Sequence, residues 1–266
     1  MPQVVQSGCR LNYRVDGDSR GEALLFSNSL GTTHELWRPQ VDALSSRFRI
    51  IRYDTRGHGA SDAPRGEYTI EQLGLDAIAI LDAVGVERAH VCGLSLGGLT
   101  AMWLGVNAPE RVRSLTLSST AARIGSISMW TERIADVNAN GVASLADAAM
   151  GRWFTAGYRA AHADVVSVYH RMLGATPADG YVGCCAAIRD ADLREAIKSV
   201  AVPTLVIAGR EDPVTPPSDA EDMRARIDGA RVEILNAAHI ANVEQAQTYN
   251  DLLSSFIAKH SRSMNG

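Results

Sequence analysis

The sequence lacks the features that mark proteins which bind nucleic acid or span a membrane. Its formal net charge is −4, and no run of Lys and Arg forms the basic stripe that a phosphate backbone attracts. No stretch approaches the roughly 18 uninterrupted apolar residues of a membrane span. We therefore expect neither nucleic acid nor a membrane as a partner.

The N-terminal residues do not resemble a leader segment, and the cysteines do not suggest a metal site or a disulfide bond. The first 17 residues contain no basic region followed by an apolar core, so they do not resemble a secretory signal, and we expect a cytoplasmic location. The cysteines lack the spacing of a zinc site, and the adjacent Cys184 and Cys185 cannot easily bridge each other. We expect buried free thiols at Cys9, Cys92, Cys184 and Cys185.

Cofactor motifs are likewise missing. No G-x-G-x-x-G fingerprint or Walker loop stands between a strand-like and a helix-like run. The acidic residues are scattered, and no His, Asp and Glu cluster has metal-ligand spacing. We predict that the protein uses no cofactor and no metal.

What the sequence does contain is an alternation of strand-like and helix-like segments. The chain has 266 residues, 46% of them hydrophobic, which is enough for a large core. Residues 69–85 have apolar positions at helical spacing and end at a glycine, and residues 9–17 suggest antiparallel strands at the start. Strand-like runs lie at 22–30, 48–54, 90–95, 113–119, 203–209 and 231–237. This alternation predicts an α/β fold with a mostly parallel sheet covered by helices on both faces.

The alternation breaks in the middle of the chain. Between about residues 121 and 200 the sequence is helical in character, with several Trp and Tyr and no convincing strand. We interpret 122–195 as an inserted helical lid, and 1–121 with 196–266 as the core domain. The alternative is an ordinary set of helices packed on one face of the sheet.

A candidate nucleophile lies in the first half. Gly93-Leu94-Ser95-Leu96-Gly97 matches G-x-S-x-G, between a strand-like run at 89–93 and a helix-like run at 98–109. The small residues allow a sharp, strained turn that projects the Ser95 hydroxyl into a site. The alternative is a glycine-rich turn with a structural serine.

A serine hydroxyl needs a base within hydrogen-bond reach. His239 follows the last strand-like run near the end of the chain, where the order Ser…Asp…His places the base. We regard His34 and His58 as structural or substrate-side residues. The remaining histidines fit the role less well by position: His90, His162, His170 and His260.

The third member of such a triad is a carboxylate that orients the imidazole. Asp212 lies just beyond the strand-like run at 203–209 and before a proline-marked turn. Glu211 is its immediate rival, and Asp212 could instead cap the following helix.

Acyl chemistry also requires donors for the developing oxyanion. The backbone N–H of Leu96, next to the nucleophile, is the first candidate. The second should come from the loop after the strand-like run at 22–30, and we assign it to the backbone N–H of Leu30.

The order of these motifs resembles the α/β-hydrolase superfamily. The resemblance rests on the segments 26–40, 52–62, 93–98, 205–217 and 237–245 and covers the chain from end to end apart from the lid. It implies an α/β-hydrolase fold with an eight-stranded sheet. Within the superfamily, SNSLGTTHELW with RYDTRGHG is similar to the 3-oxoadipate enol-lactonases of bacterial aromatic degradation. Asn28-Ser29 replaces the usual His-Gly pair of the oxyanion loop, as in the enol-lactonase variant.

The resemblance implies that Ser95, His239 and Asp212 open the enol-lactone ring through an acyl-enzyme, with water as co-substrate. The substrate carries a free carboxylate, which favours an arginine near the site. Arg133, Arg152 and Arg210 are candidates, with Trp130 and Trp153 as apolar walls. Each could instead be a solvated arginine or a lid-core aromatic. The sequence does not indicate an oligomeric state.

Two other functions remain open. The first is another serine hydrolase on the same scaffold, such as a carboxylesterase or a C–C bond hydrolase, because a fold does not fix a substrate. The second is a ligand-binding protein that retains the triad and turns over negligibly.

Overall fold

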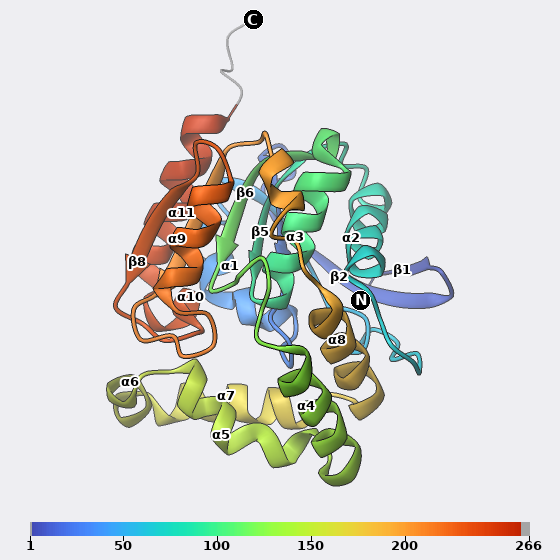
Figure 1. The fold of residues 1–266 in the computed structure, drawn as a ribbon. Helices are drawn as coiled ribbons and strands as arrows, with labels where there is room; N and C mark the ends of the chain where they lie inside the picture. The colour runs from blue at the N-terminus through green and yellow to red at the C-terminus, as the bar shows by residue number, and fades with distance from the viewer. Residues whose placement is uncertain (1, 262–266) are drawn as a thin grey trace, which may run out of the picture.

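The computed structural model describes residues 2–261 and contains one sheet of eight strands with helices on both faces (Figure 1). The spatial order is β1-β2-β4-β3-β5-β6-β7-β8. The strands are β1 (Gln3–Gln6), β2 (Cys9–Gly17), β3 (Glu22–Ser27), β4 (Phe48–Tyr53), β5 (Ala89–Leu94), β6 (Val112–Ser118), β7 (Thr204–Gly209) and β8 (Arg231–Leu235). β2 pairs antiparallel with β1 and β4, and the other pairs are parallel. The predicted strands and the antiparallel start are confirmed.

Eleven α-helices lie in the described part of the chain. They are α1 (Arg38–Leu44), α2 (Ile70–Ala83), α3 (Leu96–Asn107), α4 (Ile127–Asn140), α5 (Ala146–Trp153), α6 (Ala156–Ala161), α7 (Ala163–Gly174), α8 (Ala178–Asp190), α9 (Pro217–Arg226), α10 (Ala241–Glu244) and α11 (Ala246–His260). The short 3-10 helix η1 (His34–Trp37) precedes α1.

Helix α2 shows how local sequence sets these boundaries. Thr69 and Gln72 form a reciprocal capping box at its start, which satisfies two backbone N–H groups that the first turn leaves free. Gly85 follows its end with φ of 67°, a left-handed conformation that glycine adopts without strain. The predicted helix at 69–85 is therefore confirmed, with its ends inside the predicted range.

The central strands form the core. All residues of β5 and β7 are buried, because helices cover both faces of a parallel sheet. Cys9, Cys92, Cys184 and Cys185 are buried free thiols, as expected. Across residues 2–261, no helix is long and apolar enough to cross a membrane.

The segment expected to be a lid consists of helices. Between β6 and β7, which are neighbours in the sheet, the chain forms α4 to α8, and these helices lie together beyond the end of β6 (Figure 1). α4 packs against α8, and α5 packs against α7. This arrangement places a helical layer over the edge of the sheet where β5, β6 and β7 end.

Candidate active site

Ser95 occupies a strained turn between β5 and α3. Its backbone has φ of 57° and ψ of −113°, a conformation that non-glycine residues rarely adopt. The Ser95 N–H donates to the Ser118 carbonyl (3.0 Å), and the Ser95 carbonyl accepts from Thr120 Oγ1 (2.8 Å). Neighbouring β6 and the loop after it therefore hold the strained turn in place, as expected where strain serves a site.

The glycines around Ser95 allow this turn to pack. A Cβ on Gly93 would collide with the backbone of Gly97, and a Cβ on Gly97 would collide with the backbone of Ser27. The first turn of α3 thus lies directly against the ends of β3 and β5. This geometry accounts for the small residues of the G-x-S-x-G pattern.

Asp212 and His239 form a buried pair. Asp212 follows β7, His239 follows β8, and His239 Nδ1 lies 2.8 Å from Asp212 Oδ2. The same oxygen accepts from Thr215 Oγ1 (2.8 Å), while Oδ1 accepts from the N–H groups of Val214 (2.8 Å) and Thr215 (3.1 Å). Burial opposes ionisation of the carboxyl, but His239 and these donors outweigh it and lower the Asp212 pKa below its usual value. Glu211 is exposed, so Asp212 is the carboxylate that meets His239.

A cavity of about 180 Å³ joins the serine to this pair. Ser95 and His239 both line it, although no hydrogen bond connects their side chains in the described structure. Such contacts are often long before a substrate binds. The lining comes from the loop after β3, the turn at Ser95, the helical segment between β6 and β7, and the loops after β7 and β8: Ser29, Leu30, Ser95, Ile124, Gly125, Met129, Trp130, Arg133, Ala149, Arg152, Trp153, Leu173, Tyr181, Pro213, Val214 and His239.

The two candidate oxyanion donors lie beside this cavity. Leu30 lines it, and Leu96 begins α3, where an N–H has no partner inside the helix. Within residues 2–261, neither of these N–H groups donates to another protein group.

The candidate substrate residues divide into two groups. Trp130, Arg133, Arg152 and Trp153 line the cavity, whereas Arg210 does not. Arg210 is exposed, and its Nε donates to Asn236 Oδ1 (3.0 Å). The prediction for Arg210 is not supported by this placement.

The two cavity arginines have no acidic partner within 4.0 Å among the described residues. Both are partly buried. Burial and the neighbouring charge of Arg133 lower the pKa of Arg152. An anionic ligand would relieve this repulsion.

Two polar residues that support Asp212 and the His239 loop were not predicted from the sequence. Thr215 bonds the Asp212 carboxylate, and Glu244 accepts from the N–H groups of Ala238 (3.1 Å) and Thr155 (3.2 Å). Glu244 thereby ties the loop that carries His239 to the start of α6. A carboxylate five residues after a candidate histidine was the one available hint.

Of the histidines described, His239 is the one that lines the cavity. His34 and His58 are buried and hydrogen-bonded to the protein, which favours their structural interpretation. His58 is fully buried, and burial lowers its pKa to about 4 despite opposing effects of the Arg56 carbonyl and Asp54.

This shift predicts a pH-dependent stability. The unfolded state, with a histidine pKa of about 6.5, binds more protons than the folded state below that pH. His58 should therefore lower the free energy of unfolding by about 2 kcal/mol between pH 7 and pH 5. Urea unfolding at both pH values should show a smaller loss in His58→Gln, which keeps an acceptor but does not titrate. Equal losses in the two proteins would contradict the assignment.

Comparisons with known proteins agree with this fold. A family model described as alpha/beta hydrolase fold matches residues 22–246. 3-Oxoadipate enol-lactonase 1 of Acinetobacter baylyi is 41% identical over 252 residues, covering 95% of this chain and 94% of its own. 3-Oxoadipate enol-lactonase 2 of the same organism is 42% identical over 240 residues, covering 90% of each chain. The crystal structure of the enol-lactonase from Burkholderia xenovorans superposes with a TM-score of 0.95 and 41% identity, covering 97% of this chain and 100% of that one.

Proposed function

This chain belongs to the α/β-hydrolase fold family, and we propose that it hydrolyses 3-oxoadipate enol-lactone to 3-oxoadipate with Ser95, His239 and Asp212 as catalytic triad. The observation that carries the proposal is a cavity lined by Ser95 and His239 that also contains two arginines without acidic partners in the described structure. The enol-lactonase names of relatives with 41–42% identity support the substrate.

Ring opening is the first chemical step. Ser95 Oγ attacks the lactone carbonyl carbon while His239 Nε2 takes the hydroxyl proton, and Asp212 stabilises the resulting imidazolium through Nδ1. The N–H groups of Leu30 and Leu96 stabilise the oxyanion. When the intermediate collapses, the bond to the ring oxygen breaks and an acyl-enzyme forms. His239 Nε2 gives its proton to the departing enolate, which becomes the ketone, and the base is again neutral. The enolate is a better leaving group than a simple alkoxide because its charge is delocalised.

Deacylation repeats the same proton transfers. His239 Nε2 removes a proton from water, the hydroxide oxygen bonds to the acyl carbon, and the same N–H pair stabilises the second oxyanion. Collapse breaks the bond to Ser95 Oγ, which regains its proton from His239. The product is 3-oxoadipate, and the enzyme returns to its starting state.

We assign residues 122–195 to a lid on the core of 1–121 and 196–266. Helices α4, α5, α7 and α8 supply Trp130, Arg152, Leu173 and Tyr181 to the cavity wall. The core supplies the nucleophile, base and oxyanion donors. With this division, lid residues determine which substrate binds, while core residues carry out the chemistry.

Arg133 and Arg152 are the proposed partners of the substrate carboxylate. Arg133→Gln and Arg152→Gln should each raise KM for the lactone about tenfold with little change in kcat, because a charged hydrogen bond contributes about 1.5–3 kcal/mol and partial exposure weakens it. The uncharged substrate phenyl acetate should show no such change. Arg210→Gln is the matched control because that side chain lies outside the cavity. Unchanged lactone KM in the first two variants would exclude them as carboxylate ligands.

The substrate assignment is tested by comparing freshly generated 3-oxoadipate enol-lactone with simple aryl esters. Loss of the lactone's ultraviolet absorbance should give a kcat/KM far above that for phenyl acetate. A much faster ester reaction would favour a carboxylesterase instead. Tight lactone binding without turnover or acyl-enzyme burst would favour a ligand-binding protein.

A further inference from the structure

The peptide between Ser29 and Leu30 is held by one side chain. The Ser29 carbonyl accepts hydrogen bonds from Thr32 Oγ1 (2.8 Å) and from the Thr32 N–H (3.2 Å). The peptide is trans, so its carbonyl and its N–H point in opposite directions. The Thr32 hydroxyl therefore fixes the direction of the Leu30 N–H without touching it. Thr32 is fully buried, so water does not compete for this carbonyl.

The next peptide is held by a second side chain. The Gly31 N–H donates to His58 Nε2 (2.9 Å), and His58 Nδ1 lies 3.2 Å from the Arg56 carbonyl. These partners require the neutral tautomer, with the proton on Nδ1 and the lone pair on Nε2. Gly31 has φ of 76°, and a side chain there would collide with Leu173. Both peptides that flank Leu30 are thus anchored.

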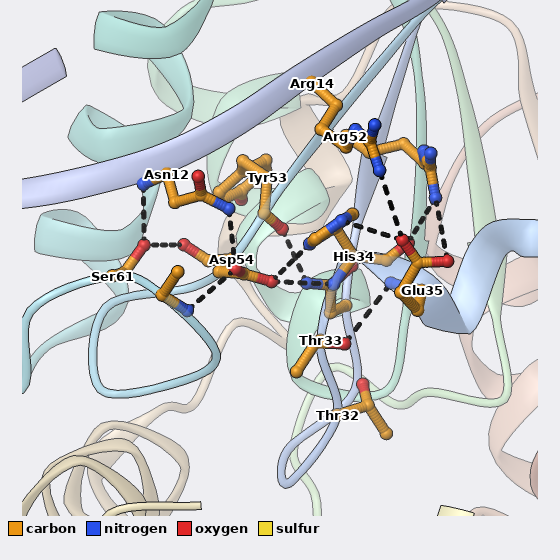
Figure 2. Close-up of polar contacts among 12 residues, drawn as sticks. Asn12, Arg14, Thr32, Thr33, His34, Glu35, Arg52, Tyr53, Asp54 and Ser61 are labelled. Carbon is orange, nitrogen blue, oxygen red and sulfur yellow. Dashed lines mark hydrogen bonds and ion pairs between the residues drawn. The ribbon is translucent and has the colours of Figure 1, made fainter. Parts of the chain in front are cut away.

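The far end of the same loop is anchored by Asp54, as Figure 2 shows. Asp54 Oδ1 accepts from the His34 N–H (2.8 Å) and lies 2.8 Å from His34 Nδ1. Its Oδ2 accepts from Asn12 Nδ2 (2.8 Å) and the Ala60 N–H (3.0 Å). Asp54 and His58 both come from the segment that follows β4. That segment therefore fixes the loop at His34 as well as at Gly31.

From these contacts we infer that Thr32 and His58 are positioning residues that keep the Leu30 N–H directed into the cavity. The inference rests on the proposed role of Leu30 as an oxyanion donor. If the Ser29–Leu30 peptide rotated, its N–H would turn away and its carbonyl would face the oxyanion. The Thr32 hydroxyl opposes that rotation at the carbonyl, and His58 opposes it one peptide further on. Neither side chain contacts the reacting atoms.

Thr32→Val tests the inference because valine has nearly the same shape but no hydroxyl. We expect kcat to fall about tenfold, since one buried hydrogen bond is lost while the Thr32 N–H still bonds Ser29. KM should stay within about twofold, because the oxyanion exists only along the reaction path. Thr32→Ser, which restores the hydroxyl, should recover kcat to within about twofold.

Thr204→Val is the matched control. Thr204 is a buried threonine whose hydroxyl donates to the Val202 carbonyl (3.0 Å) at the start of β7, away from the cavity. It should lose a similar amount of thermal stability and keep its kcat. Equal kcat losses in Thr32→Val and Thr204→Val would overturn the inference, and so would a loss expressed in KM alone.

Phenylboronic acid provides a readout that a general loss of stability would not change. Its boron accepts Ser95 Oγ and becomes a tetrahedral anion that resembles the oxyanion intermediate. The inhibition constant should rise about tenfold in Thr32→Val, in parallel with the fall in kcat. An unchanged constant would show that Leu30 is positioned without Thr32.

A comparison of the two substrates distinguishes a failure of this inference from a failure of the proposed function. An oxyanion forms from any ester, so the Thr32 variants should behave alike on the lactone and on phenyl acetate. Ester hydrolysis without lactone hydrolysis would refute the proposed substrate and leave the Thr32 effect measurable. A kcat that is normal on both substrates in Thr32→Val would refute the inference and leave the substrate assignment intact.

Discussion

Ser95→Ala should lower kcat for both the lactone and aryl esters by about 10⁶-fold, since it removes the atom that forms the acyl-enzyme. The remaining rate over water should come from the oxyanion donors and substrate binding, which do not involve the hydroxyl. Substrate KM should change little, because the cavity lining is otherwise intact. Stopped-flow absorbance should also show no burst of leaving group.

The fold of this variant should be unaffected. Alanine at position 95 keeps a Cβ and so retains the backbone strain at φ of 57°, and the anchoring bonds to Ser118 and Thr120 involve only the Ser95 backbone. Ser254→Ala, a buried serine in α11 away from the cavity, is the control and should keep full activity. If Ser95→Ala retained more than about 1% of wild-type kcat, Ser95 would not be the nucleophile.

The sequence was informative wherever periodicity and chain order determine structure. The six strand-like runs correspond to β3 to β8. In β5 and β7 every residue is buried, which favours apolar residues on both faces of these parallel strands. Ser95, Asp212 and His239 follow β5, β7 and β8, whose carboxyl ends meet at one edge of the sheet. Chain order alone could therefore predict that these three residues converge.

Side-chain direction just beyond a strand could not be predicted in the same way. Arg210, Glu211 and Asp212 are consecutive, yet the first two are exposed and only Asp212 turns inward to His239. The turn that sets these directions is fixed by backbone bonds to the strand next door, such as Arg210 N–H to the Leu235 carbonyl (2.8 Å). A shift of one residue along this turn would place a different side chain in the site.

The helical segment and the loop after β3 illustrate a second limit of prediction from the sequence. Which residues of the helical segment face the cavity depends on how each helix docks, so the resemblance could suggest Arg133 and Arg152 but could not separate them from Arg210. Thr32 and His58 are 26 residues apart in the sequence, yet their side chains bond the two peptides that flank Leu30. Neither hydrophobic periodicity nor motif spacing predicts such a contact.

Asp212→Asn should lower kcat by about 10⁴-fold while leaving the fold intact. The reason lies in the four groups around the carboxylate. Oδ1 accepts two backbone N–H groups, from Val214 and Thr215, and an amide nitrogen cannot accept them. The asparagine must therefore place its oxygen there and its NH₂ group at the Oδ2 position, facing His239 Nδ1.

That orientation forces the wrong tautomer on His239. Nδ1 would have to accept from the NH₂ group, so the proton would move to Nε2, which could then no longer take the proton of Ser95. The Thr215 hydroxyl can rotate to accept the second N–H of the amide, so the fold should tolerate the change. Glu211→Gln, the same substitution on the adjacent exposed residue, is the matched control and should keep wild-type kcat. An Asp212→Asn enzyme within tenfold of wild-type kcat, with an unchanged melting temperature, would show that this carboxylate does not orient the catalytic base.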